Sequence, residues 1–369
     1  MIYSVEDKHS VHQHNGGGKR FPSFSDTINM VEVEDDIVRY SPNTCYNLTP
    51  TYQDGDEQIK YEEISRAADL LTIKHNGHYI LTKDIDMKGH VWTPVSFSSG
   101  AVFNGNGHTI SNLSITTKNH DAAMFGSNSG VIKNLILSNT TVSLLNEKSG
   151  TYISSVLVGT NGGEIFNCTV KNGKITHNNN VDQKNTKHYT GVIAGQNIGD
   201  GKITFCSIID SSVSVNSIVK ARGNHTTVYA GGVTGYNTNI ISNSVATSTA
   251  FSFNVSQKWT GVGIIGGLHE PEVDLYIGGL VGYCASEAKE VSYCFSDVKP
   301  SSFAISVDIG SYGNMWGTAP SAGKVNVYAG YLIGSSTSAK SIYECYYTGG
   351  DGIKYGIYMD SKVKKSGLC

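Results

Sequence analysis

The amino-acid sequence predicts an all-β protein, built as a parallel β-solenoid with a short N-terminal capping helix and an irregular N-terminal arm. Three observations predict this fold: a short apolar phrase ending in glycine recurs, a second strand-like phrase follows each copy, and turn residues are abundant. Glycine supplies 42 of the 369 residues and only 16% are charged. Asparagine, serine and threonine must therefore cover much of the surface.

Each of the six copies of the first phrase ends in a glycine. These residues, here called the anchor glycines, are Gly126, Gly159, Gly195, Gly235, Gly282 and Gly334. Their separation grows from 33 to 52 residues along the chain, so the added residues are expected in loops between stacked strands. Glycine at a fixed corner predicts a positive φ angle. Four copies carry an asparagine two residues later, and stacking at about 4.8 Å would make these residues an amide ladder; they are Asn128, Asn161, Asn197 and Asn237.

The second phrase carries a recurrent cysteine, at Cys168, Cys206, Cys294 and Cys345. Leucine and serine fill the same position in other copies, which is typical of a small buried side chain. We therefore expect packed, reduced thiols rather than disulfides or a metal site. None of the seven cysteines forms C-x₂-C, so a zinc or thioredoxin-like site is not expected.

These phrases resemble the GLUG-type repeat of bacterial and phage surface β-solenoids. The resemblance is best at Gly279–Gly282 and Gly232–Asn237, and the region from Gly77 to Leu113 resembles the part that precedes such repeats. It covers roughly residues 60–347. The resemblance implies a right-handed β-helix of the kind found on adhesins, secreted proteins and appendages, where the repeat is scaffold or binding surface.

The chain divides into an arm and a solenoid. We expect residues 1–57 to form an attachment segment and residues 58–369 the solenoid, with the repeats at 122–347. Helical spacing of apolar residues predicts a capping helix near residues 61–71. The histidines at positions 9, 12 and 14 are expected to be solvated rather than metal-bound.

Charge and hydropathy exclude several classes of function. The net charge of −3 lacks the basic excess of a nucleic-acid-binding protein. No apolar run is long enough for a membrane helix, and the first residues do not form a signal peptide. We expect a virion or cell-surface protein that is exported by another route or assembled inside the cell. Gly261–Gly266 matches G-x-G-x-x-G, but a β-repeat follows it, so we expect a loop and no cofactor.

The long insertions carry the candidate ligand-binding residues. Exposed aromatic and polar side chains on loops are typical of sugar or protein recognition, and the candidates are Trp259, Trp316, Tyr312 and His225. Most aromatic residues in the insertions are expected to pack loops onto the coil. Four tyrosines each precede an anchor glycine by six residues, which predicts a structural stack of Tyr189, Tyr229, Tyr276 and Tyr328.

No convincing catalytic site is predicted. Glu164 and Asp200 each follow an anchor glycine by five residues, so stacking could bring the two carboxylates together, as a glycosidase requires. The strands after them begin at different offsets, and solvated turns are the expected role. A β-helical polysaccharide lyase or glycosidase therefore stays as the alternative.

The leading hypothesis is a non-enzymatic structural or binding protein, such as an adhesin-like surface protein or a virion fibre, spike or decoration. Its arm would contact protein partners in a larger assembly, and its loops a host-surface glycan or protein. An internal component of a large assembly is a further alternative. Neither nucleic-acid binding nor membrane insertion is expected.

Overall fold

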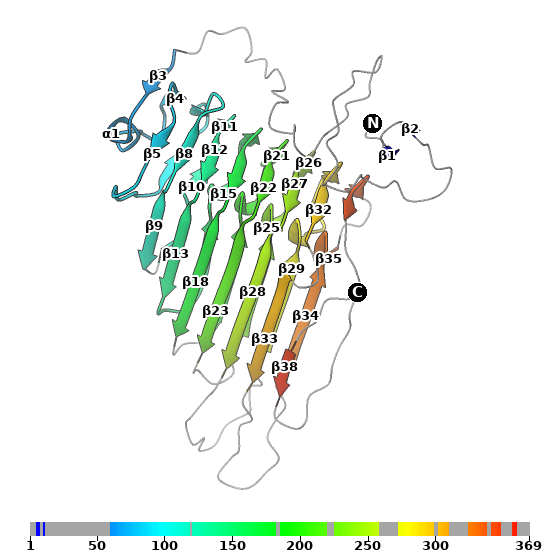
Figure 1. Ribbon diagram of the computed structural model, residues 1–369. Coiled ribbons are helices and arrows are strands. Elements are labelled where there is room, and N and C mark those ends of the chain that lie inside the picture. Colours follow the sequence, from blue (N-terminus) through cyan, green and yellow to red (C-terminus); the bar gives the residue numbers. More distant parts are fainter. Residues whose placement is uncertain are drawn as a thin grey trace, which may run out of the picture.

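The protein folds as a parallel β-solenoid in the computed structural model (Figure 1). The structure describes residues 5–7, 10–11, 60–118, 120–181, 185–219, 225–257, 272–298, 302–309, 324–337, 341–347 and 356–359. Each full coil contributes one strand to each of five parallel sheets, which we number 1 to 5 in the order the chain visits them. The predicted fold class is confirmed.

Sheets 1 to 3 are made of short strands. Sheet 1 comprises β6 (Val95–Phe97), β10 (Phe125–Asn128), β15 (Val158–Asn161), β20 (Ala194–Asn197), β25 (Thr234–Asn237), β30 (Val281–Cys284) and β35 (Ile333–Ser336). Sheet 2 comprises β3 (Glu62–Ile64), β4 (His78–Leu81), β7 (Val102–Asn104), β11 (Val131–Lys133), β16 (Glu164–Phe166), β21 (Lys202–Thr204), β26 (Ile240–Ser242), β31 (Glu290–Ser292) and β36 (Ile342–Tyr343). Sheet 3 comprises β5 (Ile85–Asp86), β8 (Thr109–Ser111), β12 (Ile136–Ser138), β17 (Thr169–Lys171), β22 (Ser207–Ile209), β27 (Val245–Thr247), β32 (Phe295–Asp297) and β37 (Tyr346–Tyr347).

Sheets 4 and 5 contain the longer strands. Sheet 4 comprises β9 (Ser114–Lys118), β13 (Thr141–Asn146), β18 (Lys174–Val181), β23 (Ser212–Val219), β28 (Ala250–Gln257), β33 (Phe303–Ile309) and β38 (Gly356–Met359). Sheet 5 comprises β14 (Gly150–Ser155), β19 (Thr186–Gly191), β24 (His225–Gly231), β29 (Glu272–Gly278) and β34 (Lys324–Gly330). The coil lengthens partly in these strands and partly in the segments between the two sheets, such as 147–149 and 258–271.

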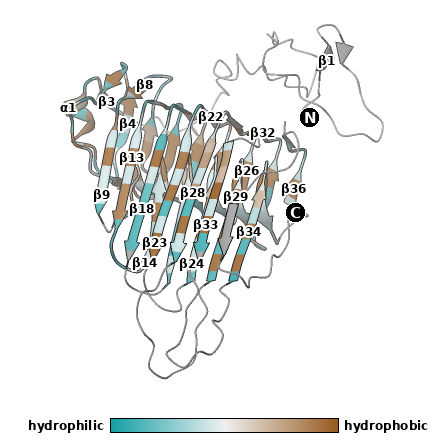
Figure 2. Ribbon diagram, turned by 60° about the horizontal axis from the view of Figure 1, so that its bottom comes forward, coloured by the Kyte–Doolittle hydropathy of each residue, from teal (hydrophilic) through white to brown (hydrophobic). Residues whose placement is uncertain are grey.

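Alternation along each strand builds the core. In β23 every second side chain from Val213 to Val219 is buried, whereas Ser214, Asn216 and Ile218 between them are less buried. Apolar and polar bands alternate along β18, β23 and β28 in Figure 2. Because successive side chains of a strand point to opposite faces, one set fills the interior of the coil and the other faces outward.

The N-terminal end differs from the expected capping helix. Glu62–Ile64 forms strand β3, which pairs in parallel with β4, and helix α1 spans only Ala67–Leu70. The strand forms because the end of the solenoid offers an unpaired ladder of backbone groups. Leu70 is fully buried, so the short helix still covers the end of the core. Within the arm, β1 (Val5–Asp7) and β2 (Ser10–Val11) form an antiparallel pair that the sequence did not predict.

The anchor glycines allow the backbones of neighbouring strands to approach each other closely. The expectation that they have positive φ angles is wrong. None of them is among the glycines with positive φ. A Cβ atom added to Gly235 would lie 2.5 Å from the carbonyl oxygen of Tyr229, because sheet 5 crosses directly over sheet 1 there. The left-handed corners lie between sheets 2 and 3 and between sheets 3 and 4 instead. Asparagines such as Asn134, Asn167 and Asn172, for which this conformation is tolerable, fill many of them.

The asparagines after the anchor glycines form the predicted amide ladder. The Nδ2 atoms of Asn128, Asn161 and Asn197 each donate to the Oδ1 atom of the asparagine in the next coil, at 2.9, 2.8 and 2.8 Å. Asn237 ends the ladder by donating to the sulfur of Cys284 at 3.7 Å. All four asparagines are buried, so the ladder satisfies amide groups that water does not reach.

The recurrent cysteines stack inside the coil as free thiols. Cys168, Cys206 and Cys294 are buried and Cys345 is half-buried. Each sulfur contacts a backbone carbonyl of the preceding coil, as in the 3.7 Å contact of Cys168 with Ile132. Burial raises the pKa of Cys206 and of Cys294, which keeps these thiols protonated and unreactive.

Candidate functional site

The outer face of sheet 5 carries a continuous row of tyrosines. The strand register pairs Tyr189 with Tyr229, Tyr229 with Tyr276, and Tyr276 with Tyr328. The rings stack with centroid separations of 5.0, 5.0 and 4.9 Å and interplanar angles of 10°, 12° and 5°. The predicted tyrosine stack is confirmed, and all four side chains are half-buried rather than enclosed.

Two tyrosines of sheet 1 stand beside this row. Tyr236 and Tyr283 lie on adjacent strands, with ring centroids 5.7 Å apart. The ring of Tyr236 is T-shaped to Tyr189 and Tyr229, at 5.6 and 5.5 Å. The anchor glycines allow this arrangement, because they bring the backbones of sheets 1 and 5 close enough for the two sets of rings to meet. Six tyrosines therefore form one aromatic corner on the outside of the coil.

Four phenol groups of the corner have raised pKa values and stay protonated. Burial raises the pKa values of Tyr189, Tyr229 and Tyr236, and raises the pKa of Tyr276 to about 12. Among the described residues, no hydrogen bond involves the hydroxyl groups of the four sheet 5 tyrosines. These hydroxyls are therefore available as donors to an external ligand.

A second row on the same face is polar. It lies two residues before each tyrosine, on the same side of the sheet, and consists of Lys187, Thr227, Asp274 and Asn326. Two residues earlier still, a third row passes through His225, Glu272 and Lys324. This third row lies at the first residues of β24, β29 and β34, which follow the segments 220–224, 258–271 and 310–323 in the sequence.

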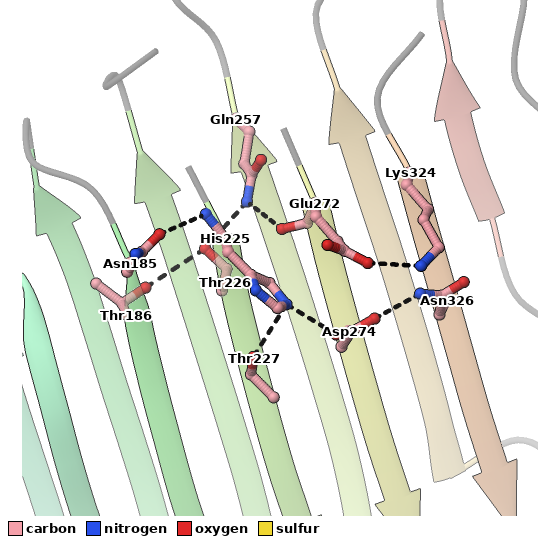
Figure 3. Close-up of polar contacts among 10 residues, drawn as sticks. All are labelled: Asn185, Thr186, His225, Thr226, Thr227, Gln257, Glu272, Asp274, Lys324 and Asn326. Carbon is pink, nitrogen blue, oxygen red and sulfur yellow. Dashed lines mark hydrogen bonds and ion pairs between the residues drawn. The ribbon is translucent and has the colours of Figure 1, made fainter. Parts of the chain in front are cut away.

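The second and third rows are joined by a hydrogen-bonded cluster (Figure 3). His225 Nε2 lies 2.8 Å from Asp274 Oδ2, and Asn326 Nδ2 donates to Asp274 Oδ1 at 2.6 Å. Lys324 Nζ donates to Glu272 Oε1 at 2.7 Å, and this bond raises the pKa of Lys324. Each carboxylate thus has a partner on a neighbouring coil, and the cluster bridges three strands.

The cluster is held from inside the coil by Gln257 of β28. Its Nε2 atom donates to Thr226 Oγ1 at 3.0 Å and to the backbone oxygen of Glu272 at 3.2 Å. Gln257 is buried, and it connects sheet 4 to the first residues of β24 and β29. This connection fixes the positions of the strands that carry His225 and Glu272.

The cluster does not have the geometry of a hydrolytic triad. Thr227 Oγ1 and Asp274 Oδ2 both approach the same ring nitrogen of His225, at 3.3 and 2.8 Å. A nucleophile–base–acid relay needs the hydroxyl and the carboxylate on opposite ring nitrogens. His225, Glu272 and Asp274 could instead hold a divalent cation, because their ligand atoms lie within 4.8 Å of one another. The ion pair with Lys324 already neutralises one of these ligands.

A second polar group lies inside the coil, between sheets 4 and 5. His188 Nδ1 is 3.1 Å from His177 Nε2, which is 2.7 Å from Asn146 Oδ1. Because Asn146 Oδ1 can only accept, His177 carries its proton on Nε2 and His188 Nδ1 accepts a share of it. Burial lowers the pKa of His188 to about 3 and that of His177 well below its usual value. Both rings are therefore neutral at physiological pH.

The structure describes one of the four predicted ligand-binding residues, His225. Trp259, Trp316 and Tyr312 lie outside the described residues, as do the G-x-G-x-x-G segment and the histidines at 9, 12 and 14. His225 lies in the surface cluster. Its partners Glu272, Asp274 and Lys324 were missed by the sequence reasoning, although a signal was present: Glu272 and Lys324 each precede an anchor glycine by ten residues, as His225 does.

The structure does not pair Glu164 with Asp200. The register aligns Glu164 with Lys202, because a turn through Gly199, with a φ of 61°, lengthens this coil before β21 begins. Asp200 is left on that turn with 97% of its side chain exposed. Stacking therefore does not bring these carboxylates together, and Asp200 lies on a solvated turn, which was its expected role.

Comparison with known proteins gives distant similarities. No family model matches the chain. A stretch of the chain is 30% identical over 177 residues to halomucin of Haloquadratum walsbyi, which corresponds to 42% of this chain and 2% of halomucin. A candidate immunoglobulin A1 protease from Bacteroides ovatus has a solved structure that aligns with 76% of this chain and 85% of its own, at 18% identity and a TM-score of 0.38. The GLUG-type assignment stays a prediction.

No helix within the described ranges is long and apolar enough to cross a membrane.

Proposed function

We propose that this chain is a non-enzymatic binding protein of a cell or virion surface, adhesin-like or part of an appendage. In this role the solenoid is a rigid scaffold of the GLUG type, and the outer face of sheet 5 is its binding surface. The observation that carries the proposal is the tyrosine row on the outer face of sheet 5, with its polar row beside it. Rigid aromatic side chains with free polar ends supply contact area at low entropic cost.

The proposal also assigns a role to the arm. Residues 1–57 would attach the protein to a larger assembly, and the coil would project from it. A parallel solenoid suits such a role because each coil stabilises only its neighbours, which gives a long rigid body from a repeated unit.

Native fractionation of the source tests the proposed function. The chain is followed by mass spectrometry through a sedimentation gradient of whole cells, envelopes and particles. We expect it to sediment with one of these fractions at a fixed stoichiometry. A chain that remains at the position of a free protein under native conditions would contradict the surface role.

One observation favours a carbohydrate-active enzyme as the second candidate. Glu272 and Asp274 place two carboxylates near each other on the outer face, and His225 lies beside them. This pair, rather than Glu164 and Asp200, is where a glycosidase or lyase would act. Release of reducing ends or unsaturated sugars from polysaccharides, lost in both Glu272→Gln and Asp274→Asn, would establish that activity in place of simple binding.

A further inference from the structure

We infer that the outer face of sheet 5 binds a neutral polysaccharide chain running parallel to the solenoid axis, with one sugar residue per coil. The inference rests on the proposed function and names the ligand class and the site. The chemistry that recognises the ligand is a row of phenol hydroxyls, one on each of four coils.

The first argument for a sugar chain is the spacing of the tyrosine row. Successive rings are separated by 4.9 to 5.0 Å, which reflects the distance between stacked strands. The repeat of an extended, equatorially linked pyranose chain is close to this distance. A sugar chain lying along the axis would therefore meet the same phenol group in every coil, whereas a chain lying across the strands would meet it once.

The second argument concerns the hydroxyl groups of the tyrosine row, which lie at the edges of the stacked rings. Neighbouring tyrosine rings cover one another's faces, so a ligand meets their edges and hydroxyl groups. Those hydroxyls have no hydrogen-bond partner among the described residues. The raised pKa values of Tyr189, Tyr229 and Tyr276 keep the hydroxyls of these three tyrosines as donors. In the parallel row Thr227 and Asn326 are buried and bond to His225 and Asp274. Each of the four coils thus offers one phenol hydroxyl to the ligand.

The charge of the face indicates a neutral ligand. Asp274 is held by His225 and Asn326, and Glu272 by Lys324, at 2.6 to 2.8 Å. Within the polar row, Lys187 is a charged residue that does not belong to this cluster. A strongly acidic or basic polymer would have to break these pairs, whereas a neutral sugar chain need not.

The periodicity favours a glycan over a folded protein partner. The same residue type recurs on four successive coils, from Tyr189 through Tyr229 and Tyr276 to Tyr328. A repeating polymer can use all four positions in the same way. The surface of a folded protein has no such repeat, and would select a few dissimilar contacts.

The test measures the affinity of the full chain for soluble neutral polysaccharides and their oligosaccharides. Galactomannan, xyloglucan, hydroxyethyl cellulose and mixed-linkage glucan serve as neutral probes in affinity electrophoresis. Polygalacturonate and hyaluronate serve as acidic probes. Calorimetry then follows the oligosaccharide series of any polymer that binds. We expect binding to a neutral polymer, with affinity rising with chain length until about four sugars span the tyrosine row, then levelling off.

The double variant Tyr229→Phe, Tyr276→Phe tests the site. Phenylalanine keeps the ring stack and removes two hydroxyls, so folding should be unchanged while affinity falls about tenfold. The matched control is Ser127→Ala with Thr160→Val, which removes two hydroxyls from the outer face of sheet 1 and should leave affinity unchanged.

The outcomes separate the inference from the proposed function. No binding to any neutral probe, affinity that does not depend on chain length, or equal affinity of the tyrosine variant and wild type would each overturn the glycan site. If the tyrosine variant then still sediments with its surface or particle, the surface role stands and only the ligand site falls. A chain that binds glycans but sediments as a free protein would have the site without the surface role.

Discussion

At the scale of single residues, the structure is most sensitive where a polar group is buried. His177 and His188 face each other inside the coil and are neutral. A charged imidazole at this position would have neither water nor a counter-ion, because Asn146 and the ring of Tyr152 surround His177. The histidine pair therefore makes the coil sensitive to acid.

We expect stability to fall as the pH drops below about 6.5. The pKa of His188 is lowered to about 3 in the folded state, so the unfolded chain binds a proton that the folded chain does not. The stabilising contribution is complete above the unfolded pKa and is lost by about 1.4 kcal/mol per pH unit below it. Thermal unfolding between pH 7.5 and 5 measures this slope, which should be much smaller in the double variant His177→Leu, His188→Leu. An unchanged slope in that variant would refute the assignment.

The amide ladder makes a second prediction at this scale. Replacing Asn161 by alanine leaves the Oδ1 of Asn197 without its donor and removes the shortest of three hydrogen bonds from the Nδ2 of Asn128. Both neighbours are buried, so we expect a loss of about 2–4 kcal/mol in the free energy of unfolding. Denaturant unfolding measures it. Asn216→Ala removes a similar amide contact from the outer face and should cost under about 0.5 kcal/mol; equal losses in the two variants would contradict the role of burial.

At the scale of the element, the close contact between sheets 5 and 1 explains why glycine is required at the anchor position of sheet 1. A Cβ atom on Gly235 would lie 2.5 Å from Tyr229 O and 2.8 Å from Thr190 N, and both contacts are with backbone that cannot rotate away. Gly126 precedes the first strand of sheet 5, and its nearest contact would be a serine hydroxyl at 3.1 Å. Glycine is therefore required at Gly235, where sheet 5 lies against sheet 1, and less so at Gly126, where it does not.

We expect Gly235→Ala to destabilise the protein by more than about 3 kcal/mol, because the two strands must separate to admit the methyl group. Gly162→Ala is the matched control, since its added Cβ would find its nearest neighbours at 3.7 and 3.8 Å. The control should change the free energy of unfolding by less than about 1 kcal/mol. Soluble yield and denaturant unfolding of the two variants measure the difference, and a Gly235 variant as stable as the control would show that the strands can move apart.

Element boundaries were predictable only where residues repeat. The apolar phrases before the anchor glycines and the cysteine-containing phrases correspond to the corners and strands of sheets 1 to 3. The segment at 61–71 has helical spacing but no repeat, and β3 forms there because it can pair with β4. Local spacing does not reveal whether a neighbouring strand edge is available, and pairing with that edge outweighs the weak preference of a short helix.

At the scale of the whole molecule, stability comes from contacts between successive coils. Each sheet is a continuous parallel ladder, and the buried side chains form one core from Ile64 to Ala329. The described coils require no contact from the arm to complete these ladders. Folding of the solenoid and attachment to an assembly should therefore be separable.

Deleting residues 1–57 tests that separation. We expect the shortened chain to unfold at the same temperature as the full chain, within about 2 °C, because the ladders between coils are intact. Under the proposed function it should no longer sediment with its surface or particle. Retained sedimentation would show that the arm is not the attachment segment, and early unfolding would show that it belongs to the fold.

The sequence by itself determined the solenoid and the stacking of its asparagines, cysteines and tyrosines. These follow from residues that recur at fixed offsets, because every coil repeats the same environment. The sequence placed His225 in an insertion, whereas the structure places this residue at the start of β24. The tertiary structure decided which carboxylates meet. Glu164 aligns with Lys202 and Asp200 remains on a turn, whereas Glu272 and Asp274 join His225 across adjacent strands. The register of each coil depends on corner lengths and strand pairing together, and a change of two residues at a corner moves every following side chain to a different neighbour.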